Sequence, residues 1–213
     1  TSRHPFSAAP QIYDDLRRPG TYGLLIEYAM PHSALAQSIG EAPSTPVISC
    51  GLIGCGNYAT RVLVPALRRL QAAPAAYASA NGLTARLLAG EGALATTDVQ
   101  RLWDDASLRA VFIATRHDEH GELARAAICA GKSVWVEKPL ALTEADLDAT
   151  LAVARASSAC LAVGFNRRFA PLAVRLRAAL AAKSGPRRFT VEVNAGRLPS
   201  GHWTLDPQQG GGR

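Results

Sequence analysis

A glycine-rich segment stands where an apolar run, residues 47–53, gives way to a helical pattern. The segment reads Gly54-Cys55-Gly56-Asn57-Tyr58-Ala59. Gly54 permits a tight turn, Gly56 lets the backbone approach a pyrophosphate, and Ala59 allows a helix to pack closely on a strand. The N-terminus of that helix adds unpaired N–H groups and a partial positive charge. The spacing therefore predicts that residues 54–59 bind a dinucleotide.

The position that would contact the ribose follows a second expected strand, residues 75–79. An acidic residue about 20 positions after the turn would accept hydrogen bonds from both ribose hydroxyls and repel a 2′-phosphate. The sequence has Ser79-Ala80-Asn81-Gly82 there instead. Ser79 and Asn81 can bond either a hydroxyl or a phosphate, whereas we expect Arg86 to be a solvated helix residue. The choice between NAD and NADP therefore stays open.

A polar segment follows the apolar run at residues 110–114. It reads Thr115-Arg116-His117-Asp118-Glu119-His120. Because ligands of parallel sheets bind beyond the carboxyl ends of the strands, Thr115 and Arg116 are expected near a bound dinucleotide. His117 and His120 have no third ligand nearby, and the two acidic residues between them suit the first turn of a helix. We therefore expect no metal site.

A lysine follows the next apolar strand pattern, residues 133–137. In Glu137-Lys138-Pro139 the amine would point into the crevice that Gly56 and Thr115 border. A cation there can hydrogen-bond a substrate hydroxyl, favour its ionisation and help deliver hydride. Taken alone, Lys138 would be a surface lysine before a turn proline, and only the neighbouring motifs favour the catalytic interpretation.

These motifs need a sheet that brings the strand ends together. Between residues 47 and 164, apolar runs without polar alternation are separated by helical patterns, which indicates a parallel sheet covered by helices on both faces. We therefore predict an α/β fold with a Rossmann-like, doubly wound parallel sheet. The expected strands are residues 47–53, 75–79, 110–114, 133–137 and 160–164, and the expected helices are residues 60–70, 119–130 and 143–156.

The pattern changes on both sides of this region. After it, a helix is expected at residues 171–182 and an alternating strand at residues 188–194. Before it, residues 1–28 read as a helix opening at Ala8-Ala9-Pro10 and then a strand at residues 21–28, too little to bury a core alone. Residues 29–46 hold three prolines and have linker composition. Neither end shows a start or stop pattern, so we expect a fragment.

The charge distribution and the cysteine content bear on whether the chain binds nucleic acid, a membrane or zinc. The net charge is +6, and the excess lies in residues 166–213, with nine basic against two acidic side chains. That segment lacks the interleaved aromatics of nucleic-acid-binding modules. No apolar run approaches the ~18 residues of a membrane span. The four cysteines form no C-x-x-C pair and no zinc-ligand spacing, so we expect a reducing, cytoplasmic compartment.

Residues 47–164 resemble the nucleotide-binding domain of the Gfo/Idh/MocA oxidoreductase family. The motifs that carry the resemblance are Gly51–Ala59, Phe112–His117, Ala130–Leu140 and Gly164–Pro171. It implies that Lys138 is the active-site lysine, that the Lys138–Pro139 bond is cis, and that Asn166 and Arg167 lie where two domains meet. The implied cofactor is NAD or NADP, bound by Gly54, Gly56, Asn57, Tyr58, Ala59, Ser79, Asn81, Thr115, Arg116, His120, Glu137, Lys138, Pro139, Asn166 and Arg167.

Residues 187–213 resemble the first strand of that family's second, open-sheet domain, so the truncated start of an α+β domain is expected. Residues 194–199 and 202–204 look like substrate-side elements of a sugar-processing branch. The implied substrate-binding residues are Lys138, Arg167, Arg197, His202 and Trp203. The family's Asp-x-x-x-His element does not occur before Arg213, so we expect this piece to be incomplete for catalysis.

Residues 1–28 resemble the end of a zinc-type medium-chain alcohol dehydrogenase domain. The resemblance is carried by His4-Pro5-Phe6, Ala9, Tyr13-Asp14, Leu16 and Gly23–Tyr28. Together the resemblances imply a two-domain oxidoreductase of polysaccharide biosynthesis. The expected parts are a domain tail at residues 1–28, a linker at 29–46, an NAD(P)-binding Rossmann domain at 47–165 and the start of a substrate domain at 166–213.

The sequence thus predicts an NAD(P)-dependent oxidoreductase that transfers a hydride between a nicotinamide and a hydroxyl or carbonyl of a sugar or nucleotide sugar. The alternative function is non-catalytic. In that case the glycine turn still binds a dinucleotide, but the chain is a module that senses redox state or scaffolds a partner. The full-length protein is expected to be a homo-oligomer, with no nucleic-acid or membrane partner.

Overall fold

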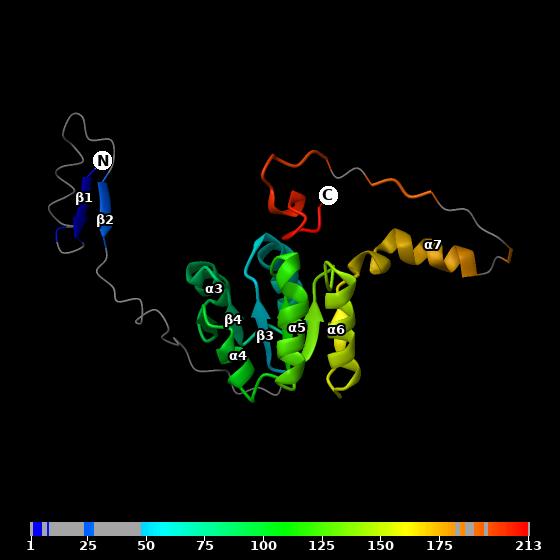
Figure 1. Cartoon of the computed structure of the whole chain (residues 1–213), viewed down its shortest axis with the longest axis horizontal. Helices are drawn as coiled ribbons and strands as arrows, with labels where there is room; N and C mark the ends of the chain where they lie inside the picture. The colour runs from blue at the N-terminus through cyan, green and yellow to red at the C-terminus, as the bar shows by residue number, and fades with distance from the viewer. Residues whose placement is uncertain are drawn as a thin grey trace. The chain divides into compact units, whose positions relative to one another are not determined.

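The computed structural model describes residues 2–5, 8, 24–27, 48–181, 184–185, 190–193 and 196–212. The chain forms two compact units, residues 1–37 and 38–213. In the first unit, β1 (Ser2–Pro5) pairs in parallel with β2 (Leu24–Glu27), with Ser2 opposite Leu24 (Figure 1). Strand β2 lies within the expected strand at residues 21–28, whereas β1 was not expected. Beyond Ala8, the helix expected to open there lies outside the described residues.

The second unit is built on a six-stranded sheet in which every neighbouring pair of strands is parallel. The spatial order is β5-β4-β3-β6-β7-β8. From β3 the chain first moves outward through β4 and β5, then returns beside β3 and moves the other way. The doubly wound sheet is therefore confirmed. The strands are β3 (Cys50–Ile53), β4 (Ala76–Ala78), β5 (Leu94–Thr96), β6 (Ala110–Ile113), β7 (Ser133–Val136) and β8 (Leu161–Val163).

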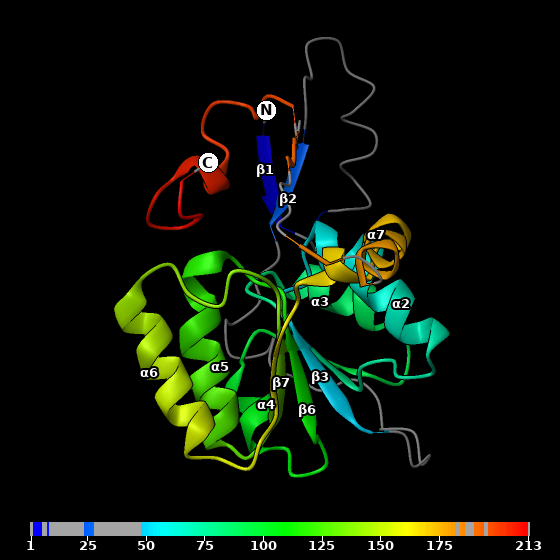
Figure 2. The same cartoon turned by 90° about the vertical axis from the view of Figure 1, so that its right-hand side faces the viewer.

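Helices cover both faces of this sheet, as Figure 2 shows for α5 and α6 on one side and α2 and α3 on the other. Along β3, β4, β6 and β7, side chains alternate between two apolar cores. Leu52 packs in one core with α2 and α3, and its neighbour Ile53 packs in the other with α4 and α5. The helices are α2 (Val64–Arg69), preceded by the π-helical turn η3 (Ala59–Leu63), α3 (Gly82–Ala89), α4 (Gln100–Asp104), α5 (His120–Cys129) and α6 (Glu144–Arg155).

The helix ends follow the sequence signals. The Thr143 side chain accepts a hydrogen bond of 3.2 Å from the backbone N–H of Asp146, which caps the start of α6 as expected. Gly131, just after α5, has φ +74°, a conformation that glycine adopts without a steric cost. These two signals mark the start of α6 and the end of α5.

After β8 the chain forms the 3₁₀ turn η5 (Asn166–Phe169) and the helix α7 (Pro171–Ala181), which was expected. The strand expected at residues 188–194 is wrong where it can be checked, because residues 190–193 have no strand structure. Val191 and Val193 are 83% and 62% exposed. A strand needs a neighbour to pair its N–H and C=O groups, and no described strand lies beside this segment.

Among the described residues, no helix is both long and apolar enough to cross a membrane.

Candidate dinucleotide and substrate site

The glycine turn lies at the point where the strand order reverses, between β3 and β6. Gly54 follows β3 with φ +93°, and its N–H donates to the carbonyl oxygen of Ala78 across 2.9 Å. A Cβ atom at Gly54 would lie 2.5 Å from backbone atoms of Ala114 and 2.7 Å from the nitrogen of Thr115. Only glycine fits this position, because both the conformation and the close approach exclude a side chain. The turn is therefore packed directly on the loop that follows β6.

The next glycine, Gly56, leaves open space for a bound dinucleotide, whereas Gly54 is packed tightly against its neighbours. Gly56 is exposed, and a Cβ atom there would meet no atom of the described residues within 4 Å. The backbone turns helical at Asn57, and the N–H of Thr60 donates to the Gly56 carbonyl across 2.9 Å. Ala59, on the first turns of this helix, is fully buried. Free space beside a helix N-terminus is the arrangement that accepts a pyrophosphate.

Cys55, between the two glycines, plays no part in this chemistry. Its thiol is buried and lies 3.8 Å from the Ala78 carbonyl oxygen. Burial raises the pKa of Cys55 to about 11, so the sulfur stays protonated at neutral pH.

The candidate ribose residues are engaged in starting α3. The side-chain oxygen of Asn81 caps the helix by accepting from the N–H of Leu83 at 3.1 Å. The hydroxyls of Ser79 and Thr84 lie 3.1 Å apart. Arg86 donates to the carbonyl of Gly90 at the end of the same helix. That contact agrees with the expectation of a helix-surface arginine.

The loops after β6 and β7 are joined by one buried imidazole. His120 begins α5 and is 0% exposed. Its Nδ1 lies 2.7 Å from the carbonyl oxygen of Pro139, and its Nε2 lies 3.3 Å from that of Thr115. The loop beside the glycine turn is thereby tied to the loop that carries the lysine.

Lys138 lines a pocket of about 270 Å³ with Asn166, Arg167, Phe165 and Arg168. The peptide bond between Lys138 and Pro139 is cis, as the family resemblance implies. The backbone N–H of Lys138 donates to the carboxylate of Glu137 across 2.9 Å. The structure therefore brings three expected site residues, Lys138, Asn166 and Arg167, to one pocket.

One residue of this pocket is bonded to Tyr58, on the first helical turn after Gly56. The side-chain amide of Asn166 donates to the Tyr58 hydroxyl across 3.2 Å. Burial raises the pKa of Tyr58, the bond from Asn166 lowers it, and the nearby charge of Glu137 raises it. The ends of β7 and β8 therefore border one pocket, and this hydrogen bond links the pocket to the helix that follows β3.

Phe165 and Arg168 were not expected to line this pocket. The Arg168 guanidinium lies 5.7 Å from the centre of the Phe165 ring, a cation–π distance. Both residues flank Asn166 and Arg167 in the motif at residues 164–171, so their position in the sequence was the available signal.

The segment at residues 202–210 packs on the loop after β6. Trp203 meets the ring of His117 edge-on, with centroids 4.7 Å apart. Nδ1 of His117 lies 3.0 Å from the carbonyl oxygen of Gly210, and Arg116 donates to the side-chain oxygen of Gln209 across 2.5 Å. Trp203 thus packs on His117, the neighbour in the chain of Arg116, which is expected to contact the cofactor.

The other two expected substrate residues are placed differently. Nδ1 of His202 lies 2.8 Å from the Thr204 hydroxyl, and it accepts from the Thr204 N–H, so this imidazole caps the turn η6 (Trp203–Leu205). Arg197 is exposed on the segment before that turn.

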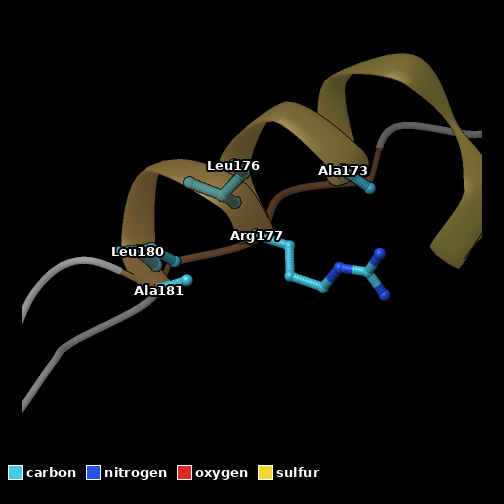
Figure 3. Close-up of a pocket in the computed structure, with 5 residues that line it drawn as sticks. All are labelled: Ala173, Leu176, Arg177, Leu180 and Ala181. Carbon is cyan, nitrogen blue, oxygen red and sulfur yellow. The ribbon is translucent and has the colours of Figure 1, made fainter.

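A second pocket, of about 410 Å³, lies along α7 (Figure 3). Its lining is aliphatic except for Arg177, whose guanidinium points away from the helix in the close-up. The lining offers no group that exchanges protons near neutral pH, so this pocket is a poor candidate for chemistry. Within the described part of the chain, no three His, Cys, Asp or Glu side chains are placed to hold a metal ion.

Comparison with known proteins agrees with this geometry. Residues 48–165 match the model of the Gfo/Idh/MocA oxidoreductase family, described as an NAD-binding Rossmann fold. The chain therefore belongs to that family.

The chain is 35% identical to inositol 2-dehydrogenase 2 of Saccharopolyspora erythraea, over 72% of this chain and 46% of that protein. It is 31% identical to 1,5-anhydro-D-fructose reductase of Ensifer adhaerens, over 76% of this chain and 50% of that protein. A 3-ketoreductase from Actinomadura kijaniata, solved with NADP and TDP-benzene, superposes with a TM-score of 0.63 at 26% identity, covering 78% of this chain and 52% of that one. The chain spans about half the length of the curated relatives it matches.

Proposed function

We propose that this chain is the NAD(P)-binding part of an oxidoreductase that transfers a hydride between a nicotinamide and a CH–OH carbon of a sugar, polyol or nucleotide sugar. The observation that carries the proposal is that Asn166, which lines one pocket with Lys138, is hydrogen-bonded to Tyr58 on the helix that opens at the glycine turn. Relatives named for inositol, anhydrofructose and a TDP-linked ligand support the substrate class.

In this proposal the chain's own residues have separate tasks. Backbone N–H groups at residues 56–59 hold the pyrophosphate, and Ser79, Asn81, Thr115 and Arg116 line the nucleoside side. A bound nicotinamide supplies the hydride acceptor or donor. Lys138 hydrogen-bonds the substrate oxygen and stabilises the negative charge that develops on it as its proton moves.

The lining of the pocket suits a hydroxyl-rich substrate. Lys138, Arg167 and Arg168 present cationic donors, and Asn166 presents an amide, beside the aromatic face of Phe165. Such donors bind hydroxyl and phosphate oxygens. Arg197, His202 and Trp203 complete the proposed substrate side.

The test combines binding and turnover, both measured in the full-length protein. Calorimetry measures the binding of NAD⁺ and NADP⁺. Absorbance at the nicotinamide band measures turnover of myo-inositol with the oxidised cofactors and of 1,5-anhydro-D-fructose with the reduced ones. Lys138→Ala is compared with Arg69→Ala, an exposed cation at the end of α2. We expect dinucleotide binding in all three proteins and loss of turnover in Lys138→Ala alone.

Two results would overturn this proposal. Absence of dinucleotide binding at millimolar concentration would show that NAD and NADP are not the cofactors. Dinucleotide binding with unchanged turnover in Lys138→Ala would show that Lys138 is not catalytic. That result would favour the non-catalytic dinucleotide module.

We also propose a domain organisation for the chain. Residues 1–28 would close a preceding domain similar to the zinc-type alcohol dehydrogenases, 29–46 would be a linker, and 166–213 would begin the substrate domain of a cytoplasmic, oligomeric enzyme of polysaccharide biosynthesis. The separate unit at residues 1–37 and the proline content of the linker support this division. Limited proteolysis tests it, with first cleavage expected within residues 29–46.

A further inference from the structure

His120 is a polar side chain with no surface, although it stands at the carboxyl edge of the sheet. It was expected to bind the cofactor, yet its ring is enclosed between the loops after β6 and β7. A ring without exposed atoms cannot contact a dinucleotide from the cleft. Its conspicuous property is instead that both nitrogens face backbone oxygens of those loops.

The two contacts define the protonation of the ring. The partners, Pro139 O at 2.7 Å and Thr115 O at 3.3 Å, are both acceptors, so each contact needs an N–H from the ring. A neutral imidazole carries one N–H. The shorter contact takes it, which makes His120 the Nδ1–H tautomer with Nε2 unprotonated.

A second proton, on Nε2, would complete the hydrogen bond to Thr115 O, but burial of the ring opposes this protonation. Burial lowers the pKa of His120, and the two backbone contacts offset this only in part. Of the titratable groups that act on the ring, His117 on the preceding turn lowers the pKa and Glu137 at the end of β7 raises it. The His117 ring centroid lies 5.7 Å away.

The bonded carbonyls stand next to the two halves of the site. Pro139 directly follows Lys138, and Thr115 lies against Gly54 so closely that a Cβ would not fit between them. One imidazole therefore spans from the loop packed on the glycine turn to the loop that carries the amine.

We infer that His120 is a positioning residue, which holds Lys138 in register with the glycine turn through its Nδ1–H bond to Pro139 O. The inference rests on the proposed function. It assigns His120 neither contact with the cofactor nor proton transfer. Misplacing a reacting group by about 1 Å can cost about 100-fold in rate, so this bond would affect kcat more than dinucleotide binding.

Three substitutions distinguish the effect of the Nδ1–H bond to Pro139 O from the effect of losing the buried ring. His120→Asn keeps an N–H donor near the position of Nδ1, His120→Gln moves the donor toward Nε2, and His120→Leu has no donor. In the full-length protein, we expect His120→Leu and His120→Gln to lower kcat by about 10- to 100-fold with little change in the KM for the dinucleotide. His120→Asn should recover most of the loss.

Thr150→Val is the matched control. Thr150 is also 0% exposed, but its hydroxyl donates to Asp146 O at 2.8 Å and accepts from Arg125 at 2.7 Å, between α5 and α6. We expect it to lower the melting temperature without lowering kcat. If His120→Leu keeps wild-type kcat, or if His120→Asn is as impaired as His120→Leu, the inference is overturned.

A second measurement does not depend on turnover. The ¹⁵N spectrum of the His120 ring in the wild-type protein should show a protonated Nδ1 and an unprotonated Nε2 at pH 7. An Nε2–H tautomer would overturn the inference. Absence of dinucleotide binding and turnover in the wild-type protein would instead refute the proposed function, and the ring spectrum would still decide whether His120 holds Pro139 O.

Discussion

The side-chain amide of Asn166 donates to the hydroxyl of Tyr58 across 3.2 Å, although 108 residues separate them in the chain. Tyr58 stands on the helix that opens at the glycine turn, and Asn166 follows β8 and lines the pocket of Lys138. The bond therefore joins the proposed cofactor side of the cleft to the proposed substrate side.

This bond should appear as a coupling between the two residues. A hydrogen bond of this kind contributes about 0.5–1.5 kcal/mol, so Tyr58→Phe and Asn166→Ala should be non-additive by that amount in the free energy of unfolding. Urea denaturation of the two single variants and the double variant measures it. Additive losses would mean that the contact contributes nothing in solution.

The two glycines of the turn should fail in opposite ways when replaced by alanine. Gly54→Ala forces a Cβ into the backbone at Ala114 and should cost at least about 2 kcal/mol of stability, since it adds strain to a left-handed position. Gly56→Ala meets open space, so its melting temperature should stay near that of the wild type while dinucleotide binding weakens. Thermal unfolding and calorimetry check both. Wild-type affinity in Gly56→Ala would place the pyrophosphate elsewhere.

Stability should depend on pH through His120. Its pKa is lowered in the folded state from an ordinary value near 6.5, so the unfolded chain binds more protons between the two values. The contribution of the neutral ring is complete above pH 6.5 and is lost progressively as the pH falls from 6.5 to the folded-state pKa. Urea denaturation from pH 8 to pH 5 should show a steeper loss for the wild type than for His120→Leu, and parallel curves would contradict this.

Cysteine reactivity should divide into two classes. Cys50 and Cys55 are buried, and burial raises the pKa of each to about 11, whereas Cys129 and Cys160 are exposed. We expect a thiol reagent at pH 8 to label the two exposed residues rapidly and the two buried ones only on unfolding. Mass spectrometry of the native protein identifies the labelled residues. Rapid labelling of Cys55 would mean that the glycine turn opens readily.

The sequence was most informative where a local signal and the sheet agree. The apolar runs predicted five of the six strands of the main sheet, because buried parallel strands lack polar alternation. The glycine spacing placed the turn, and Thr143 marked the start of α6. The strand β5 and the helix α4 were not predicted, because a three-residue strand and a five-residue helix are too short to show a period.

The remaining features depend on long-range contacts. The alternating pattern at residues 188–194 predicts a strand, but pairing decides whether a strand forms, and residues 190–193 have no described partner. The contacts of Arg116 with Gln209 and of His117 with Gly210 each span 93 residues. The enclosure of His120 also arises from tertiary packing, so the sequence assigned His120 to the cofactor site by family resemblance and did not show it as a link between loops.

The most direct test of a shared cleft is a crystal structure with bound dinucleotide. We expect the pyrophosphate against residues 54–59 and the nicotinamide facing the Lys138 amine, with room for one substrate hydroxyl between them. A nicotinamide on the far side of the sheet from Lys138, or a pyrophosphate bound away from Gly56, would contradict the account.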